Sequence, residues 1–409
     1  MMTVDSPVVL LSAFVMHPTM TSEPGIGWRF LLSTARAAAR RGVRVVVVTN
    51  RRSYEACVDA VPADLAETIE LQVVDLPVQL AVFRWQHPRF TRIEHEMWVA
   101  VARPHVRALA QRRRIVYAHH VTFASDLLST PITALRGGVP IVWGPVGVRG
   151  QARAFLVRPR FPGARVHAAL EVVRNMITAI ASRRVIRHCH LVLAQSDDFA
   201  RGVSRRGVDC RPFPNLLVRS EFASAHRSRR VDEFRLLFVG HVIERKRPDL
   251  AVALLSDPRL AESTLTIVGN RETDFFDHVV ALAGELGVDD RVTFTGPLDP
   301  SGVREAMENA DVLVHLSARE GAPGVVAEAA VAGLPVVCFD GTGGASVLRY
   351  CGGPGVTENP ATATISSLTT AVLSAAMEHG RSGVDLGDDR FQQLAEDLLE
   401  WSVARRAVS

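Results

Sequence analysis

The sequence predicts an α/β protein made of two β/α units, each with its own parallel sheet, and three observations support this fold class. Short apolar runs, typical of buried strands, alternate with helical patterns along the whole chain. Residues 1–230 hold 33 arginines against 16 acidic residues, whereas residues 231–409 hold 14 basic and 27 acidic residues. A short polar and charged stretch, residues 220–231, separates the two parts. The charge split therefore predicts two domains with different partners.

The composition is that of a globular protein with sizeable cores, since 47% of the 409 residues are hydrophobic and 22% are charged. The first apolar run, residues 8–16, is too short to span a membrane and follows no Lys or Arg, so it predicts a first strand and not a signal peptide. Five scattered cysteines without metal-type spacing fit a reducing compartment. We therefore expect a cytoplasmic protein.

The first unit is predicted to begin with a strand at 8–14, a loop at 17–28, a helix at 29–41 and a second strand at 43–49. Further strands are expected at 70–75, 114–120, 138–144 and 191–195, and helices at 92–110 and 166–187. The loop ends in S-E-P-G-I-G-W, in which Gly25 and Gly27 lack a third glycine three residues on. The G-x-G-x-x-G pattern of a dinucleotide site is therefore absent.

The second unit is predicted to begin with a strand at 234–240, followed by a loop with the only lysine of the chain, Lys246. More strands are expected at 265–269, 292–296, 312–316 and 335–340, with helices between them. Residues 391–403 have the pattern of a final amphipathic helix.

The stretch from Glu320 to Glu328 is predicted to be the functional centre of this second unit. It follows the strand at 312–316, so Glu320 lies on a strand-to-helix loop and Glu328 about one turn inside the helix. Both carboxylates can then face one cleft at the carboxyl end of a parallel sheet, where α/β folds bind ligands. The backbone amides of Gly324 and Val325 begin the helix, which is a suitable place for a phosphate group.

Two glutamates eight residues apart in this setting resemble the E-x7-E signature of retaining glycosyltransferases of the GT-B fold, family 4. The resemblance extends to Gly240 and Lys246, which match the family's glycine and the lysine six residues later, and Arg245 is a frequent companion of that lysine. Two positions depart from the pattern. His241 replaces the usual arginine, and Arg247 replaces the usual glycine.

The resemblance implies two facing Rossmann-like domains, residues 1–225 for the acceptor and 226–387 for the nucleotide sugar, with a final helix at 388–409 packing back on the first domain. It also implies that Glu320 binds the hydroxyls of the donor sugar and Glu328 the ribose diol. The expected reaction transfers a sugar from a UDP- or GDP-linked donor to a sugar-containing acceptor with retention of configuration.

The chain is expected to work without a metal ion, because it contains no Asp-x-Asp triplet to hold Mg²⁺ or Mn²⁺ on the diphosphate. Fixed cations can stabilise a leaving nucleoside diphosphate in place of a metal. The resemblance assigns this work to Arg245 and Lys246, together with the amides of Gly324 and Val325.

Two fragments of the first unit resemble one branch of the same family. The S-E-P-G-I-G-W string matches an N-terminal loop in which the glycines, here Gly25 and Gly27, approach the donor phosphate and the acceptor. The strand that ends at His119-His120 matches one whose terminal histidine faces the transferred sugar. Because side chains alternate along a strand, only one of the two can face the cleft, and we favour His120.

Residues 149–165 carry five arginines among the apolar Phe155, Leu156, Val157 and Phe161. This composition is expected of a segment in a membrane interface, and anionic lipid attracts nearby basic residues. We therefore expect the first domain to dock at the inner face of the cell membrane, where a lipid-linked acceptor is available. The alternative is a soluble acceptor with solvated arginines.

Other functions remain open at this point. The chain can have another GT-B activity, such as a nucleotide-sugar epimerase or a phosphorylase. It can also be a non-catalytic GT-B subunit, which the change at His241 favours and the intact Glu320 and Lys246 oppose. No nucleic-acid-binding motif accompanies the positive charge of the first half.

Overall fold

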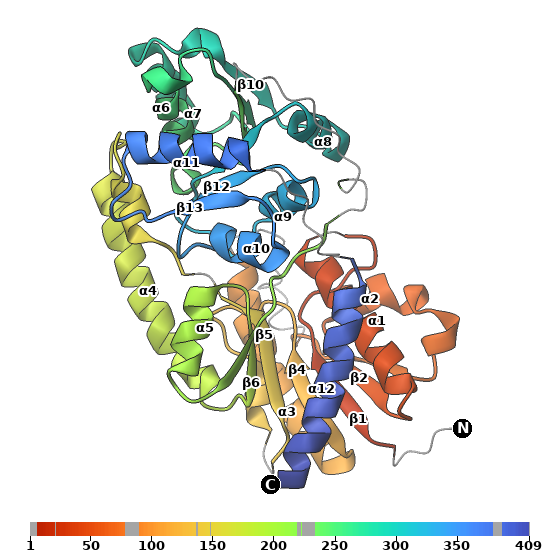
Figure 1. Cartoon of the computed structure of the whole chain (residues 1–409). Coiled ribbons are helices and arrows are strands. Elements are labelled where there is room, and N and C mark those ends of the chain that lie inside the picture. Colours follow the sequence, from red (N-terminus) through yellow and green to blue (C-terminus); the bar gives the residue numbers. More distant parts are fainter. Residues whose placement is uncertain are drawn as a thin grey trace.

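The computed structural model describes residues 6–20, 22–77, 90–135, 138–147, 149–218, 222, 234–378 and 387–408. These residues form two α/β domains, each built around one parallel sheet (Figure 1). The two-domain architecture expected from the sequence is therefore confirmed. The expected boundary between residues 225 and 226 lies outside the described residues.

The first domain contains a seven-stranded sheet of order β3-β2-β1-β4-β5-β6-β7. Its strands are β1 (Val8–Ser12), β2 (Arg44–Thr49), β3 (Ile69–Val73), β4 (Ile115–His120), β5 (Ile141–Val146), β6 (Leu191–Ala194) and β7 (Asp209–Pro212). Its helices are α1 (Glu23–Ala39), α2 (Arg51–Cys57), α3 (Thr91–Arg112), α4 (Ala164–Ile186) and α5 (Asp197–Ser204). The strand order reverses between β1 and β4, so a ligand crevice is expected at their carboxyl ends.

The second domain contains a six-stranded sheet of order β10-β9-β8-β11-β12-β13. Its strands are β8 (Arg235–Val239), β9 (Thr264–Val268), β10 (Val292–Gly296), β11 (Val312–His315), β12 (Val336–Phe339) and β13 (Gly355–Glu358). Its helices are α6 (Pro248–Leu254), α7 (Asp274–Glu285), α8 (Pro300–Glu308), α9 (Gly324–Val331), α10 (Gly343–Cys351) and α11 (Ile365–Met377). Here the order reverses between β8 and β11, directly before the loops that hold Lys246 and Glu320.

The last helix, α12 (Asp389–Val408), returns to the first domain and lies along α1 (Figure 1). Its apolar side chains Phe391 and Leu398 are buried in the core between α1 and the sheet. Arginine–carboxylate pairs join the two helices, among them Arg40 with Glu396. The helix predicted from residues 391–403 is thus present and longer than expected.

Helix α1 begins at Glu23, six residues before the predicted start at residue 29. Pro24 occupies its first turn, where a proline is tolerated because that amide has no partner within the helix. Gly25 and Gly27 are therefore helical, and the expected glycine loop is wrong. A Cβ atom on Gly25 would lie 1.6 Å from the carbonyl oxygen of Met20. Glycine is needed at position 25 because the backbone at Met20 passes so close to α1.

The segment at 149–165 does not have the exposed apolar side chains that a membrane-interface segment requires. Phe155, Val157 and Phe161 are each only 3% exposed, and they lie in the core of the second domain beside Phe275 of α7. The expectation of membrane contact through these side chains is therefore wrong. Their composition reflects a segment that leaves the first domain to complete the core of the second.

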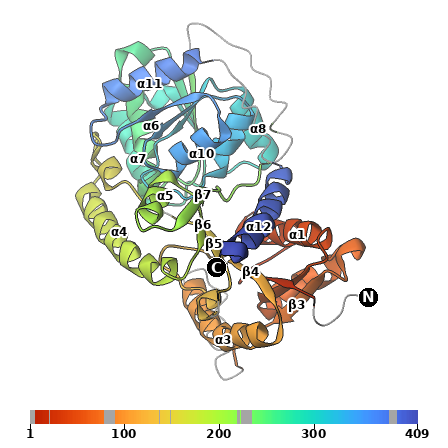
Figure 2. The ribbon, with the colours of Figure 1, turned by 60° about the horizontal axis from the view of Figure 1, so that its bottom comes forward.

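Helix α4 continues from this segment and runs along both domains (Figures 1 and 2). Near its start, Ala164 and Ala168 belong to the core of the second domain. Near its end, Val185 and Ile186 belong to the core of the first. In the described part of the chain, no helix is both long and apolar enough to cross a membrane.

Candidate functional site

The loops that follow β8 and β11 meet at the switch point of the second sheet. Backbone and side-chain hydrogen bonds tie them together, since the amide of Ala318 donates to the carbonyl oxygen of Arg245 at 2.7 Å and the hydroxyl of Ser317 donates to it at 3.1 Å. The guanidinium of Arg245 in turn donates to the carbonyl oxygen of Arg319 at 3.0 Å. These hydrogen bonds therefore join the two loops into one continuous edge.

Glu320, Arg245 and Lys246 form a charged cluster on this edge. One carboxylate oxygen of Glu320 lies 2.9 Å from a guanidinium nitrogen of Arg245 and 3.1 Å from the ammonium of Lys246. Burial raises the pKa of this carboxyl group, but Lys246, His315 and Arg245 outweigh burial and hold the pKa below its ordinary value. Glu320 is thus an ionised carboxylate that faces two cations.

Gly240 makes room for Lys246. The glycine has a φ of +147°, a conformation that side-chain-bearing residues rarely adopt. A Cβ atom there would lie 2.7 Å from the lysine nitrogen. The glycine-to-lysine spacing seen in the sequence therefore has a steric cause, because the lysine folds back across the end of β8.

His315, the last residue of β11, lies beneath this cluster and was not singled out from the sequence. It is 3% exposed, and its Nε2 atom has no hydrogen-bond partner. Burial lowers its pKa to about 4; Glu320 acts against this shift, and Lys246 adds to it. The imidazole is therefore neutral at pH 7. In the sequence His315 lies inside an apolar run, and no pattern there indicates that it ends a strand beside the charged cluster.

Helix α9 begins beside the charged cluster and carries the second glutamate. Gly324 is its first residue, Val325 its second, and Glu328 follows one turn later. Gly324 and Glu328 line a cavity of about 390 Å³ between the domains, whereas Glu320 and Lys246 lie outside its lining.

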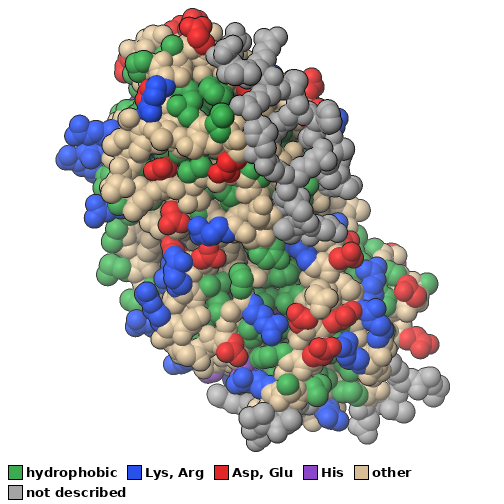
Figure 3. All heavy atoms as spheres, viewed as in Figure 1, with side chains coloured by type: hydrophobic (Ala, Val, Ile, Leu, Met, Phe, Trp, Pro, Cys, Tyr) green, Lys and Arg blue, Asp and Glu red, His purple; other side chains and the backbone are tan. Residues whose placement is uncertain are grey.

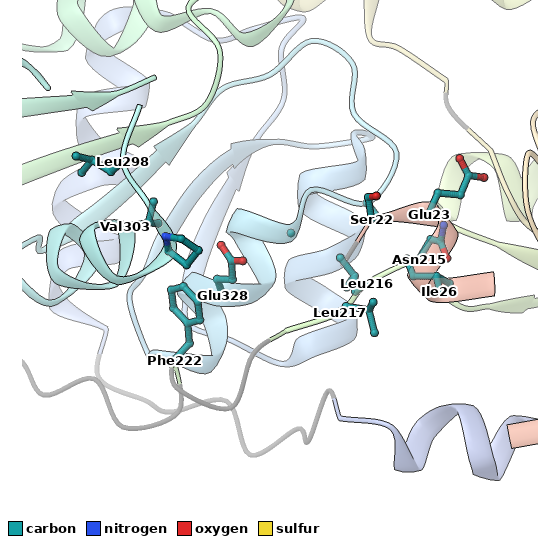
Figure 4. A pocket seen from close by; sticks show the side chains of 13 residues that line it. Ser22, Glu23, Ile26, Asn215, Leu216, Leu217, Phe222, Leu298, Val303 and Glu328 are labelled. Carbon is teal, nitrogen blue, oxygen red and sulfur yellow. The ribbon is translucent and has the colours of Figure 1, made fainter. Parts of the chain in front are cut away.

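Both domains and the chain between them contribute residues to the lining of the cavity (Figure 4). Figure 4 shows Glu328 and Phe222 on one side, with Ser22, Ile26 and Asn215 facing them from the other. Leu298, Pro300 and Val303 add an apolar wall from the start of α8. A polar carboxylate beside an apolar wall suits a ligand with a flat ring and hydroxyl groups.

Glu23 is a second residue that sequence reasoning missed. It lines the cavity from the first turn of α1, and its carboxyl group accepts a hydrogen bond of 2.6 Å from the amide of Phe123. Burial raises the pKa of Glu23, and this hydrogen bond partly offsets the shift. Glu23 belongs to the S-E-P-G string, but no second residue at a characteristic spacing indicated a functional role for it. Gly25 and Gly27, the two glycines of that string, do not line the cavity.

His119 and His120 are both fully buried and lie on opposite faces of the first sheet. His119 has its Nε2 atom 2.8 Å from the carbonyl oxygen of Gly144 and packs edge-on against Phe30. His120 has its Nδ1 atom 3.0 Å from the hydroxyl of Ser12. Burial lowers the pKa of both imidazoles, to about 4 for His119. Neither lines the cavity, and the choice of His120 as the site residue stays a prediction.

The described residues contain no group of three or more His, Cys, Asp or Glu side chains placed to hold a metal ion. The structure brings together Gly240, Arg245, Lys246 and Glu320 in one cluster. It places Gly324 and Glu328 in the adjoining cavity.

Comparisons with known proteins indicate what this chain is similar to. The model of the family described as "Glycosyl transferases group 1" matches residues 220–360. The D-inositol 3-phosphate glycosyltransferase of Mycobacteroides abscessus is 26% identical over 349 residues, 80% of this chain and 73% of that protein. The enzyme of the same name from Nocardia farcinica is 25% identical over 397 residues, 85% of this chain and 77% of that one.

Among solved structures, the apo form of the lipopolysaccharide outer core galactosyltransferase WaaB is similar, with a TM-score of 0.60, 14% identity and coverage of 98% of this chain and 99% of that one. The sucrose-phosphate synthase of Thermosynechococcus elongatus has a TM-score of 0.54 and 16% identity, with coverage of 98% and 94%. Anabaena HepE in complex with UDP has a TM-score of 0.51 and 15% identity, with coverage of 96% and 99%.

The structural likenesses show that the chain has the GT-B fold. Together with the match at residues 220–360 and the named relatives, they support a glycosyltransferase.

Proposed function

We propose that this chain is a retaining glycosyltransferase of the family 4 type, which transfers a sugar from a UDP- or GDP-linked donor to a sugar-containing acceptor. The observation that carries the proposal is the cluster of Glu320 with Arg245 and Lys246, at 2.9 and 3.1 Å, at the switch point of the second sheet. The UDP complex of the structurally similar HepE supports a nucleotide-bearing donor.

The cluster is poised for a diphosphate. Without a donor, Glu320 balances the charges of Arg245 and Lys246. Phosphate oxygens compete for the same two cations, and the resulting charge-assisted hydrogen bonds are strong. Release of Glu320 from the cations then leaves its carboxylate to accept hydrogen bonds from the hydroxyls of the donor sugar. The first amides of α9, at Gly324 and Val325, add neutral donors to the leaving group.

Glu328 completes the donor site in this proposal. It lines the interdomain cavity about one turn inside α9, where a carboxylate can accept hydrogen bonds from the two ribose hydroxyls. The apolar wall of Leu298 and Val303 is suited to the nucleobase. These roles require no metal ion, because Arg245 and Lys246 supply the positive charge.

The proposed reaction proceeds on one face of the sugar. The bond between the anomeric carbon and the diphosphate oxygen breaks, and the acceptor hydroxyl oxygen bonds to the anomeric carbon from the same side. The acceptor proton passes to the leaving phosphate oxygen, so neither glutamate acts as a nucleophile. We place the reaction in the cytoplasm, where nucleotide sugars are available, with a lipid-linked or polysaccharide precursor as acceptor.

The test is donor turnover with and without acceptors. The purified chain is incubated with UDP- and GDP-sugars, and released nucleoside diphosphate and product are measured. Because the relatives are named as D-inositol 3-phosphate glycosyltransferases, inositol 3-phosphate is one acceptor to include. Isomerised donor without acceptor would identify an epimerase, and an inverted product anomer would overturn retention.

Two variants test the cluster. Lys246→Ala and Glu320→Gln should each lower transfer by about 10²–10³-fold with the fold intact, because each removes one preorganised charged contact. Arg304→Ala is the matched control, since Arg304 forms an ion pair with Glu308 on the surface of the same domain. Near-normal turnover by Lys246→Ala would remove this lysine from the site.

A further inference from the structure

Helix α4 presents an apolar face to solvent. Seven of its hydrophobic side chains are between 49% and 61% exposed: Val166, Leu170, Val172, Val173, Met176, Ile177 and Ile180. Five of them recur at alternating intervals of four and three residues, which aligns them in one stripe along the helix. Within the part of the chain that the structure describes, no other α-helix exposes more than one large hydrophobic side chain. A contiguous exposed stripe of this kind marks an interaction surface.

The face that α4 turns inward combines small or apolar side chains at its two ends with polar ones between them. Glu171, Thr178 and Ser182 are buried, and the carboxylate of Glu171 forms ion pairs with Arg174 at 3.1 Å and Arg319 at 3.0 Å. Packing against the protein therefore fixes which way the helix faces. Buried polar contacts keep the apolar stripe on the outer side of the helix, so its exposure follows from how α4 packs in the fold.

The exposed charges on α4 and directly after it in the sequence are all positive. Arg165, Arg183, Arg184 and Arg187 are exposed on or next to α4, while its only carboxylate, Glu171, is buried. Figure 3 shows Lys and Arg side chains together with hydrophobic ones along the edge where Figure 1 places α4. Basic side chains that flank an apolar helix face are typical of helices that lie in a membrane interface.

A hollow of about 420 Å³ adjoins the start of the stripe. Three arginines line it, Arg153, Arg160 and Arg165, above apolar side chains that include Leu156 and Val172. None of these arginines forms an ion pair among the described residues. Three cationic side chains over an apolar floor fit an anionic group that is attached to a hydrocarbon chain.

We propose that α4 docks this protein on the surface of an anionic phospholipid bilayer. The stripe lies among the outer acyl chains, and the arginine hollow takes lipid phosphate groups. The helix is roughly 35 Å long, at 1.5 Å per residue, and offers a flat contact over its whole length. A second copy of the chain is a poorer occupant, because two such faces bring arginine against arginine without any exposed carboxylate from α4.

The docking surface is connected to the candidate site, and this consequence rests on the proposed function. Arg319, which pairs with Glu171 of α4, directly precedes Glu320 in the loop after β11. The inner face of the membrane-docked helix therefore supports the donor-binding edge. An acceptor carried by a lipid in that membrane would enter close to the donor.

The test is co-sedimentation of the full chain with vesicles of phosphatidylcholine alone or of phosphatidylcholine with one-quarter phosphatidylglycerol, over a series of salt concentrations. We expect binding to the anionic vesicles only, weakening as salt rises. Ile177→Glu should reduce partitioning about tenfold or more, and replacement of Arg153, Arg160 and Arg165 by Ser by about fivefold for each arginine. Val280→Glu, on α7, is the control and should bind as the unchanged chain does; Val280 is 42% exposed, against 52% for Ile177.

Several results would overturn the proposal. These are equal binding to both kinds of vesicle, no binding to either, and an equal loss in Val280→Glu. Light scattering that shows a dimer broken by Ile177→Glu would assign the stripe to a second copy, and displacement from vesicles by millimolar inorganic phosphate would assign the hollow to a soluble anion. Vesicle binding is measured without donor or acceptor. A chain that binds vesicles but transfers no sugar would therefore refute the proposed function and leave this inference standing.

Discussion

Replacement of Arg247 by alanine should destabilise the protein more than replacement of any exposed arginine. Arg247 is fully buried, and its guanidinium lies 2.8 Å from a carboxylate oxygen of Asp249. The same group donates hydrogen bonds to the carbonyl oxygens of Ala154, Val157 and Pro159. One side chain thus holds residues 154–159, which come from the first half of the sequence, to the second domain.

The expected loss follows from these contacts. Removing one partner of a buried ion pair costs about 3–5 kcal/mol of unfolding free energy, because the other charge, here Asp249, stays buried and unpaired. The carbonyl groups of residues 154–159 also lose their donor, at about 1–3 kcal/mol for each that water does not reach. Because these losses are not additive, we expect Arg247→Ala to lose about 4–6 kcal/mol.

A second substitution at this position tests the backbone. Arg247 has a φ of +55°, in the left-handed region, which costs a residue with a side chain about 1 kcal/mol more than glycine. Arg247→Gly should therefore be about 1 kcal/mol more stable than Arg247→Ala, although both lose the same contacts. Asp249→Asn removes only the charge and should leave the cation buried without its counterion.

Denaturant unfolding followed by circular dichroism measures these differences, with the melting temperature as a second readout. Arg304→Ala is the control, because this arginine forms a half-exposed pair with Glu308 one helical turn away, at 2.7 Å, and such pairs contribute about 0.5 kcal/mol or less. An Arg247→Ala protein within about 1 kcal/mol of the Arg304→Ala protein would refute the reasoning.

Two more predictions concern the folded state. The pKa values of His119 and His315 are lowered to about 4 by burial, while an unfolded histidine titrates near 6.5. The unfolded chain therefore binds more protons than the folded chain between these two pKa values. The free energy of unfolding should then fall as the pH drops from about 6.5 to 4, by about 1.4 kcal/mol per pH unit for each such histidine. Urea unfolding at pH 7 and at pH 5 measures this difference, and equal stabilities at the two pH values would contradict it. A fragment of residues 231–409 lacks Phe155 and Phe161 of its own core, so it should bind a hydrophobic dye and unfold without cooperativity unless residues 149–187 are supplied as a peptide. Cooperative unfolding of the fragment alone would contradict this second expectation.

The parts of the fold that the sequence predicts are those set by local pattern. Apolar runs of four to eight residues correctly predict most of the strands. A strand that is buried on both faces does not have to alternate apolar with polar side chains. The cluster at Lys246 and Glu320 was also predictable. A lysine six residues after Gly240 and a glutamate after β11 both follow strand ends, and a parallel sheet brings neighbouring strand ends to one edge.

The parts that the sequence does not predict depend on contacts between distant residues. Pro24 and Gly25 are loop formers by local preference, but here they begin a helix, because proline is tolerated in the first turn and the glycine admits the carbonyl group of Met20. Phe155 and Phe161 among arginines suit a membrane interface and a domain core equally well. Their contacts with residues far along the chain distinguish the two, such as those of Phe161 with Arg247 and with Phe275.

Position 247 combines a left-handed backbone with a fully buried arginine side chain. This conformation favours glycine, yet the loop adopts it with arginine in place. The guanidinium compensates for the strain by binding the segment that leads into α4. Because that segment, the loop before Glu320 and the inner face of α4 are all joined by hydrogen bonds or ion pairs, we expect them to move together. We therefore expect any opening of the cavity between α1 and α9 to occur on its other side, which Asn215 and Leu216 line.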